Sequence, residues 1–471
     1  MTTAVWGVWH LMAHLTCNLP TLLAAGNLPL LADRFPIRYL TFTRKEDYEK
    51  IRTSPAMQRL KELNVELEFE FLSPDILSDP IAAHHHAWNE ATRRARERRE
   101  YLLLMPPDVA WAGNSFGVIA DRLANGHRAV FMTYLRAESD SFLEALKKLQ
   151  EPDRIDLPVS QQKMVELCTA SLHPLMAASF RDSDFFPIHP EMILWPVPGE
   201  GFAVRVLARE MFLFDPTYFN LNSAALPDSR LTEDEVSFLC DSDDLFAVSL
   251  AEIGKDVQWH ILPRTADPLT IAPWWLRYDS KSNDFMVGQK IRWHFKPVTE
   301  AKWRAVEAGA DLLIHRLIAA REALRVWQVA QVRNCQRAAT LLALLLHTGA
   351  VAGLMRSREA ALVFLPTDEA FADLQSDLID DDADETGLRR LVESARWHVC
   401  PVAHSVVEAD DPLAAAKYEA GSGKLKTGAG ALPFTRDTDG VWQVGNATIT
   451  SDPIRTGPLA IYLVESFVGS G

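Results

Sequence analysis

Short apolar runs alternate with stretches of helical pattern between residues 4 and 150. Five runs are typical of buried strands: AVWGVW (4–9), IRYLTFT (37–43), VELEFEFL (65–72), YLLLMP (101–106) and RAVFMT (128–133). Between them lie SPAMQRLKEL (54–63), AAHHHAWNEATRRARERRE (82–100) and SFGVIADRLANG (115–126), which read as helices; Asn125-Gly126 is a typical helix end. This alternation predicts an α/β fold with a largely parallel, doubly wound sheet.

Residues 151 to 298 are less regular, with GFAVRVLAREMFLF (201–214) and KIRWHF (290–295) as expected strands. A helix with one narrow apolar seam follows, because apolar residues recur at alternating spacings of three and four. The seam consists of Trp303, Val306, Ala310, Leu313, Leu317, Ala320, Leu324 and Trp327. It is expected to pack on its own protein, with a dimer contact as the alternative.

The last section begins with an apolar helical stretch, QRAATLLALLLHTGAV (336–351), and continues with AALVFLPTDEAFADL (360–374), a strand that passes into a helix with Thr367 as N-cap. The tail VWQVGNATITSDPIRTGPLAIYLVESF (441–467) is β-rich with Gly and Asn turns. We therefore expect three parts: an α/β domain over 1–298, a long connecting helix over 299–332, and a separate α+β domain over 333–471.

Composition narrows the class of protein. Of the 471 residues, 48% are hydrophobic and 24% are charged, which is typical of a globular protein, and the net charge of −15 argues against general binding of nucleic acid or acidic lipid. The five cysteines are widely spread and lack CxxC spacing, which disfavours a disulfide framework or a zinc site. The N-terminal stretch does not resemble a signal peptide, and no window is long and apolar enough to span a membrane. A cytoplasmic location is expected.

Several acidic residues and one histidine follow or end expected strands, where they could bind a metal or act in acid/base catalysis. Asp108 follows the apolar run YLLLMP at a strand's carboxyl end, where open α/β sheets bind ligands, although a turn role is the alternative. Asp241, Asp243 and Asp244 lie within four residues, so they form either a metal or acid/base site or an exposed turn. His294 ends an expected strand and is either a metal ligand or a hydrogen-bonded core residue.

Other candidates are weaker. His84, His85 and His86 are adjacent on an expected helix, so their side chains diverge and a helix face is the better interpretation than a metal site. The basic run in ATRRARERRE is interrupted by Glu97 and Glu100 and reads as a solvated helix face. The chain has no GxGxxG, GxxxxGK[ST] or GxSxG motif. This disfavours dinucleotide oxidoreductases, P-loop nucleotidases and α/β-hydrolases, for which these motifs are typical.

Two parts of the chain resemble known families. VFLPTDEAFADL and RWHVCP resemble the two motifs of fasciclin-type domains, which implies a compact β-rich fold used in adhesion and binding over about 333–471. LPTLLAAGNLPLL, TFTRKED, LLLMPPDVAWAGNSF, LCDSDDLFAVSL and IRWHF together resemble segments of bacterial glycosyltransferases of the GT-A fold, over about 4–330. That resemblance implies a Rossmann-like mixed sheet flanked by helices, and a nucleotide-sugar donor such as a UDP- or GDP-sugar.

The resemblance also implies roles for individual residues. In this fold a strand ends in Asp-X-Asp, which binds Mn²⁺ or Mg²⁺; here Pro106 replaces the first aspartate and Asp108 remains, which puts metal binding in doubt. With Asp241 and Asp243 as replacements, the candidate metal ligands are Asp108, Asp241, Asp243 and His294. By their positions, the candidate acceptor bases are Asp243 and Glu200, which lies in a Gly-flanked loop, and the candidate nucleotide contacts are Asn27, Thr43, Arg44 and Arg136. This mechanism requires the acidic residues near 108 and near 241–244 to meet in one cleft.

The leading hypothesis is therefore a metal-dependent glycosyltransferase that acts on an unknown acceptor and carries a fasciclin-like module. The alternative is a non-catalytic scaffold or binding protein on a degenerate transferase fold, with protein contacts, and possible homo-oligomerisation, made through the 303–327 helix or the C-terminal domain.

Overall fold

The computed structural model describes residues 1–207, 210–218, 231–254, 260–263, 266–277, 286–332, 360–367, 399–420, 424–427, 430–456 and 459–465. The chain divides into two compact units. Unit 1 is drawn from Met1–Ala266 and Lys281–Ala310, and unit 2 from Asp267–Ser280 and Asp311–Gly471. The predicted domain boundaries near 298 and 332 stay predictions.

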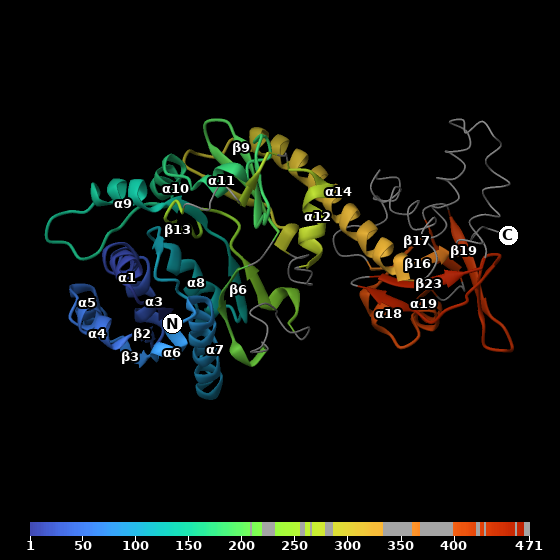
Figure 1. Ribbon diagram of the computed structural model, residues 1–471, viewed down its shortest axis with the longest axis horizontal. Helices are drawn as coiled ribbons and strands as arrows, with labels where there is room; N and C mark the ends of the chain where they lie inside the picture. The colour runs from blue at the N-terminus through green and yellow to red at the C-terminus, as the bar shows by residue number, and fades with distance from the viewer. Residues whose placement is uncertain are drawn as a thin grey trace. The chain divides into compact units, whose positions relative to one another are not determined.

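A mixed sheet forms the centre of unit 1 (Figure 1). Its strands are β1 (Thr2–Ala4), β2 (Arg38–Thr43), β3 (Glu66–Phe71), β4 (Leu102–Leu103), β6 (Ala129–Met132), β11 (Glu210–Phe214) and β12 (Val236–Phe238). A bridge between Thr2 and Leu104 joins β1 to β4, which gives the order β3-β2-β1-β4-β11-β6-β12. β11 runs antiparallel to both of its neighbours, whereas the other pairings are parallel. The predicted α/β class is confirmed, and the sheet is mixed.

Helices cover both faces of this sheet because its central strands are apolar on both sides. Along β4 and β6, successive residues belong alternately to two hydrophobic clusters, such as Ala129 and Phe131 on one face and Val130 and Met132 on the other. One face packs on α7 (Pro80–Arg98), and the other on α2 (Leu19–Leu22), α3 (Leu28–Arg34), α4 (Lys45–Arg52), α5 (Pro55–Glu62) and α8 (Ser115–Ala124). Figure 1 shows α4 and α5 beside β2 and β3, at the end of the sheet away from β6.

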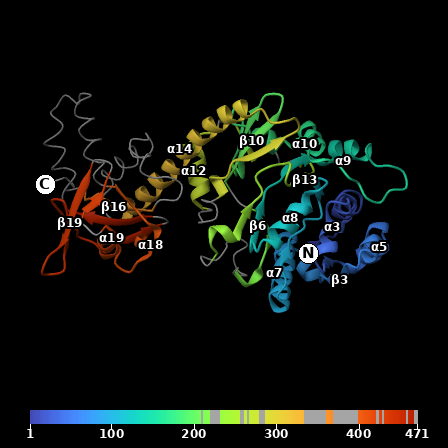
Figure 2. The same cartoon turned by 180° about the vertical axis from the view of Figure 1, so that it is seen from behind.

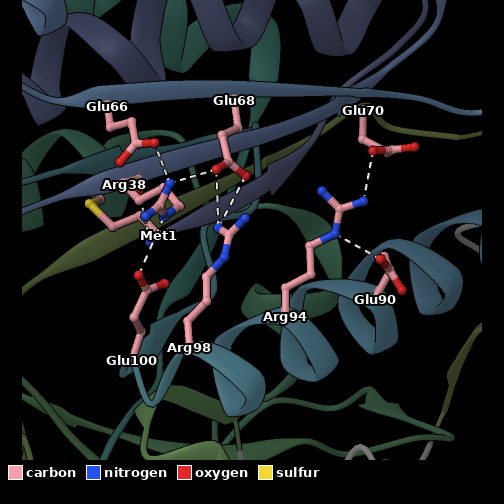
Figure 3. Close-up of polar contacts among 9 residues, drawn as sticks. All are labelled: Met1, Arg38, Glu66, Glu68, Glu70, Glu90, Arg94, Arg98 and Glu100. Carbon is pink, nitrogen blue, oxygen red and sulfur yellow. Dashed lines mark hydrogen bonds and ion pairs between the residues drawn. The ribbon is translucent and has the colours of Figure 1, made fainter.

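The arginine-rich end of α7 contributes ion pairs to the edge of the sheet (Figure 3). Alternate residues of β3 are Glu66, Glu68 and Glu70, so all three carboxylates lie on one face. Arg94 pairs with Glu70 at 2.7 Å and Arg98 with Glu68 at 3.1 Å. The expected solvated helix face is therefore in part an electrostatic contact between α7 and an edge strand.

Two smaller sheets extend unit 1. In the first, β13 (Ala247–Ala251) pairs antiparallel with β5 (Val109–Trp111) and parallel with β7 (Leu135–Glu138). In the second, β10 (Gly201–Val206) pairs antiparallel with β9 (Met192–Val197) and β15 (Ile291–His294). Figure 2 shows β10 next to α10 (Gln161–Ala170), which packs against β13 and β15. The run 201–214, expected as one strand, forms β10 and β11, which belong to different sheets.

Further elements of unit 1 complete it. The helices are α1 (Val8–Ala13), which continues as the π-helix η1 (His14–Asn18), α6 (Pro74–Leu77), α9 (Ser139–Lys147) and α11 (Pro174–Ala178), with two 3-10 turns, Pro216–Tyr218 and Glu233–Glu235. β8 (Phe186–Pro187) pairs with β14 (Ile261–Leu262). The first apolar run, 4–9, is thus only partly strand, because Gly7 with φ 81° ends it and α1 begins at Val8.

The long helix α14 (Glu300–Val332) carries the predicted seam. Trp303, Ala310, Leu313, Leu317 and Ala320 are all buried within the chain, so the expectation that the seam packs on its own protein is confirmed for these residues. The Trp327 side chain lies outside the described part. In unit 2, Arg321 of α14 lies over the ring of Trp275 on α12 (Pro268–Arg277), with the guanidinium carbon 4.0 Å from the ring centroid.

The rest of the described part of unit 2 is β-rich, as predicted. One sheet has the order β17 (Val399–Val402), β16 (Ala360–Pro366), β23 (Leu459–Val464) and β22 (Ile454–Thr456). The other has the order β18 (Lys424–Lys426), β19 (Ala431–Arg436), β20 (Trp442–Val444) and β21 (Ala447–Thr448). Two helices, α18 (His404–Glu408) and α19 (Pro412–Ala420), accompany them. The predicted helices over 336–351 and after Thr367 lie outside the described residues. Among those residues, no helix is both long and apolar enough to cross a membrane.

Candidate functional site

A turn after β12 places two carboxylates beside a histidine from β15. Asp241 and Asp243 follow the carboxyl end of β12, and Oδ1 of Asp241 accepts the backbone N–H of Asp243 at 2.9 Å, which holds the turn. The turn is tied to β15 because Ser242 N–H donates to the Arg292 carbonyl at 2.9 Å, and His294 N–H donates to the Ser242 hydroxyl at 3.1 Å. Backbone pairing between distant segments thus fixes the side chains of the site.

Asp241, Asp243 and His294 offer one ligand atom each, and these atoms lie within 4.8 Å of one another. We call them the triad. Nε2 of His294 lies 3.1 Å from Oδ1 of Asp241 and 3.6 Å from Oδ2 of Asp243. The triad is confirmed as a group that could hold a metal ion, which agrees with the metal-ligand interpretation of these three residues.

The hydrogen bond on the other side of the imidazole decides which nitrogen faces the carboxylates. Nδ1 of His294 lies 3.0 Å from the carbonyl oxygen of Lys296, and because a carbonyl only accepts, Nδ1 carries the proton. In the neutral ring Nε2 then presents a lone pair toward two carboxylates. Three acceptors that converge in this way are stabilised by a proton or by a cation between them.

Burial and hydrogen bonding oppose each other in this group. The hydrogen bond to Asp241 raises the pKa of His294, although burial of the ring works against it. Burial by itself would raise the pKa of Asp241, but the bonds from His294 and from the Asp243 N–H outweigh it and leave the pKa below its usual value. Asp244 lies in the same turn but outside the triad, and burial raises its pKa.

The donor set fits a divalent cation that accepts both oxygen and nitrogen ligands. Carboxylate oxygens suit Mg²⁺ and Mn²⁺, whereas an imidazole suits Zn²⁺ and other transition metals, so Mn²⁺ lies within the range of both ligand types. The Nδ1–H donated to a backbone carbonyl is the outer contact that orients most metal-binding histidines. Asp243 is the most exposed member, with its side chain 60% exposed against 39% for Asp241 and 4% for His294.

Asp108 lies apart from the triad. It occupies the turn before β5, where its carbonyl accepts the N–H of Leu250 at 2.9 Å. Because β5 and β13 are antiparallel, Trp111 lies opposite Ala247, and the turn that carries the triad carboxylates precedes Ala247. Asp108 and the triad are therefore at opposite ends of this ladder. Asp108 is not a member of the triad, and its predicted part in a shared metal site stays a prediction.

Glu200, a predicted acceptor base, is engaged in hydrogen bonds within the fold. Its carboxylate accepts hydrogen bonds from Thr299 N–H at 2.8 Å, from Lys302 Nζ at 2.8 Å and from Trp303 Nε1 at 3.0 Å. The bond from Lys302, with that from Thr299, lowers the pKa of Glu200 to about 2. A carboxylate with so low a pKa is a weak base, because general bases work best with pKa values near the operating pH.

Two of the predicted nucleotide contacts are buried. Asn27 is buried, and its side chain bonds the carbonyls of Thr21 and Ala112 and the N–H of Phe116, so its polar atoms are used within the fold. Thr43 is also buried, which leaves it inaccessible to a nucleotide.

Arg44 and Arg136 keep partly exposed side chains. Arg44 pairs with the buried Asp47 at 2.5 Å, and this pair continues to the N–H of Gly7 at 3.1 Å. Arg136 lies opposite Ser249 on β13, at the Asp108 end of the ladder, with its side chain 30% exposed. The ion pair of Arg136 with Glu191 is loose, at 4.0 Å, whereas that of Arg44 with Asp47 is close. Arg136 is therefore the more available of the two arginines for an anion.

Two contacts that support the site had no sequence signal. Ser242 bridges the carboxylate turn and β15, and Arg292 holds β15 to α14 through Glu307, with Nε 2.7 Å from Oε1. The first joins segments that are 52 residues apart in the chain, and the second joins a strand to a helix 15 residues further on. The DSD spacing of 241–243 was the available signal, and it identifies the carboxylates but not their support.

No family model matches the chain, and no curated protein matches it. A solved structure of a FAS1 domain pair from the insect cell adhesion molecule Fasciclin I is similar at 13% identity and a TM-score of 0.20. The similarity covers 31% of this chain and 45% of that one, so the chain matches less than half the length of that structure.

Proposed function

We propose that the N-terminal part of the chain is a glycosyltransferase that uses a nucleotide-sugar donor and a divalent cation held by the triad. The observation that carries the proposal is the position of the triad, just beyond the carboxyl end of β12 in a mixed α/β sheet. Ligands of open α/β sheets bind beyond the carboxyl ends of the strands. The strand order, with one antiparallel strand among parallel ones, supports a GT-A-like architecture.

Each residue of the triad has a distinct part in this proposal. His294 is the buried ligand and Asp241 a partly exposed one, and both are held in place because the strand and turn that carry them are hydrogen-bonded to each other. Asp243 is the exposed carboxylate and faces solvent, where it can also accept the proton of an acceptor hydroxyl. A bound divalent cation offsets the charge of a departing diphosphate. Asp108 is left out of the cation site, and Glu200 is left out as a base.

For the C-terminal section we propose a fasciclin-like interaction module. The support is the motif VFLPTDEAFADL, whose first residues form β16, and the presence of two small β-sheets. A second function, a non-catalytic binding protein on a transferase-like fold, is favoured by one observation: the residues expected to contact a nucleotide are mostly engaged within the fold.

Calorimetric titration tests the site and separates the two functions. We expect Mn²⁺ to bind the wild-type chain, and Asp243→Asn or His294→Gln to abolish that binding. Asp244→Asn is the matched control, since it removes a carboxylate from the same turn outside the triad, and it should leave Mn²⁺ binding unchanged.

UDP and GDP are then titrated with and without Mn²⁺. Binding of either that depends on Mn²⁺ and on Asp243 supports the transferase. Mn²⁺ binding without any heat from a nucleoside diphosphate would overturn the transferase and favour the binding protein. Failure of Mn²⁺ to bind would remove the cation site itself.

A further inference from the structure

A cavity lies at the opposite edge of the central sheet from the triad, where β1, β2 and β4 begin. Its volume is about 380 Å³, within the range of small-molecule sites. Apolar side chains make up most of its lining, and they come from α3, α8, β4 and β11 and the segments between them: Leu31, Phe35, Ile37, Leu103, Leu123 and Leu213. The charged rim consists of Arg38, Glu66, Arg99 and Glu100.

The carboxylates of the rim share one arginine. Arg38 pairs with Glu66, and also with Glu100 at 3.4 Å and with Glu68 at 2.6 Å (Figure 3). Arg99 differs from its neighbours, because no ion pair or hydrogen bond of its side chain occurs within the described part of the chain. Arg99 is therefore the charged group of the rim whose guanidinium is open to a ligand.

Arg99 has a backbone conformation that favours glycine or asparagine over arginine. It ends α7 in the left-handed conformation, with φ 57° and ψ 43°, and the N–H of Glu100 closes the helix end on the Ala95 carbonyl. Gly or Asn is the usual residue there, because a side chain strains this conformation. The other non-glycine residues at positive φ in the described chain, Asn64, Asn114 and Asp153, are of the types that tolerate it. Strained residues of this kind concentrate at ligand sites.

We propose that this cavity binds a small apolar molecule with one carboxylate, whose charged group pairs with Arg99 and whose apolar part contacts Leu31, Leu103 and Leu213. The guanidinium presents a planar fork of donors that matches a carboxylate. The leucines are nearly fully buried and line the cavity from three different elements. This site is independent of the triad and does not rest on the proposed transferase.

Decanoate is a suitable probe, used below the concentration at which it forms micelles, with decanol as its uncharged counterpart. Titration calorimetry of the full chain should show one decanoate bound per chain and weaker binding of decanol. Arg99→Asn removes the charge but keeps a residue that accepts the left-handed conformation, and it should weaken decanoate about tenfold to a hundredfold, the loss expected for a charge-assisted hydrogen bond. Arg99→Lys keeps the charge but not the planar fork, so its affinity for decanoate should lie between those of the wild type and Arg99→Asn.

Two further variants locate the site. Leu123→Trp fills the cavity from α8 and should abolish binding of both probes, whereas Arg93→Gln, on the exposed side of α7, should change neither. Circular dichroism checks that each variant is folded. No decanoate binding to the wild type, equal affinity of wild type and Arg99→Asn, or full binding by a folded Leu123→Trp would each overturn the proposal.

Discussion

Glu200 shows how a single buried carboxylate acquires a pH-dependent role in stability. Three donors, from Thr299, Lys302 and Trp303, tie it to the start of α14, and its pKa is about 2 against an ordinary value of 4.5. A depressed folded-state pKa contributes stability above the unfolded value, and this contribution is lost as the pH falls through the folded value. The relevant window therefore runs from about pH 4.5 down to about pH 2.

We expect Glu200→Gln to lower the urea midpoint at pH 7 and to have a smaller effect at pH 3. The amide removes the charge that Lys302 pairs with, so the variant should lose part of the acid sensitivity of the wild type. Glu62→Gln is the control, because Glu62 forms an exposed pair with Arg59 and should alter neither midpoint appreciably. Equal loss of stability at both pH values would show that Glu200 acts by shape and not by charge.

At the scale of elements, the ladder between β10 and β15 positions His294, and Gly201 is the residue that permits it. Gly201 lies opposite His294, and a Cβ there would lie 2.1 Å from the carbonyl oxygen of Trp293 and 2.7 Å from the Cα of His294. Both are backbone atoms, so the strands would have to separate. Gly199, two residues earlier, has φ 76° but open space around it.

Gly201→Ala should therefore destabilise the protein by about 1–3 kcal/mol beyond any effect on the unfolded chain, as overpacking does. Gly199→Ala should cost about 1 kcal/mol, since only the left-handed conformation is affected. Urea denaturation measures both. The backbone that must move away from the new Cβ belongs to Trp293 and His294. Gly201→Ala should therefore also weaken Mn²⁺ binding, and Gly199→Ala should not. Equal effects of the two substitutions would show that the close approach at Gly201 is not limiting.

Element existence could be predicted from the sequence, whereas pairing could not. The runs 37–43, 65–72 and 128–133 became β2, β3 and β6 because their apolar residues are covered on one or both faces. The run 201–214 was expected as one strand because its apolar pattern is nearly continuous, although its two halves pair in different sheets. Residue type also identified the triad, because Asp241, Asp243 and His294 all follow or end strands.

The sequence left the relative positions of the expected site residues open. Asp108 was expected beside the triad because both follow apolar strands, but the antiparallel pairing of β5 and β13 puts them at opposite ends of one ladder. A sequence pattern fixes which face a residue lies on and leaves strand partners and register open. Asn27 and Glu200 were expected to contact ligands because of their loop positions, and local hydrogen bonds engage them instead.

For the whole molecule, the division into two units makes metal binding testable by its effect on unfolding. All three triad residues belong to unit 1, whereas Leu317, buried on α14, belongs to unit 2. A ligand stabilises only the part that binds it, by about 2.7 kcal/mol at a hundredfold excess over its Kd. We expect scanning calorimetry to show Mn²⁺ raising one transition by several degrees and leaving the other in place.

Leu317→Asp assigns the transitions, since an uncompensated buried charge should destabilise unit 2 by about 3–5 kcal/mol. Leu312→Asp is its control, because Leu312 is 55% exposed on the same helix. The transition that Leu317→Asp lowers should be the one that Mn²⁺ does not move, and Asp243→Asn should abolish the Mn²⁺ effect on the other. If Mn²⁺ raises the transition that Leu317→Asp lowers, or raises both in the Asp243→Asn variant, the cation binds somewhere other than the triad.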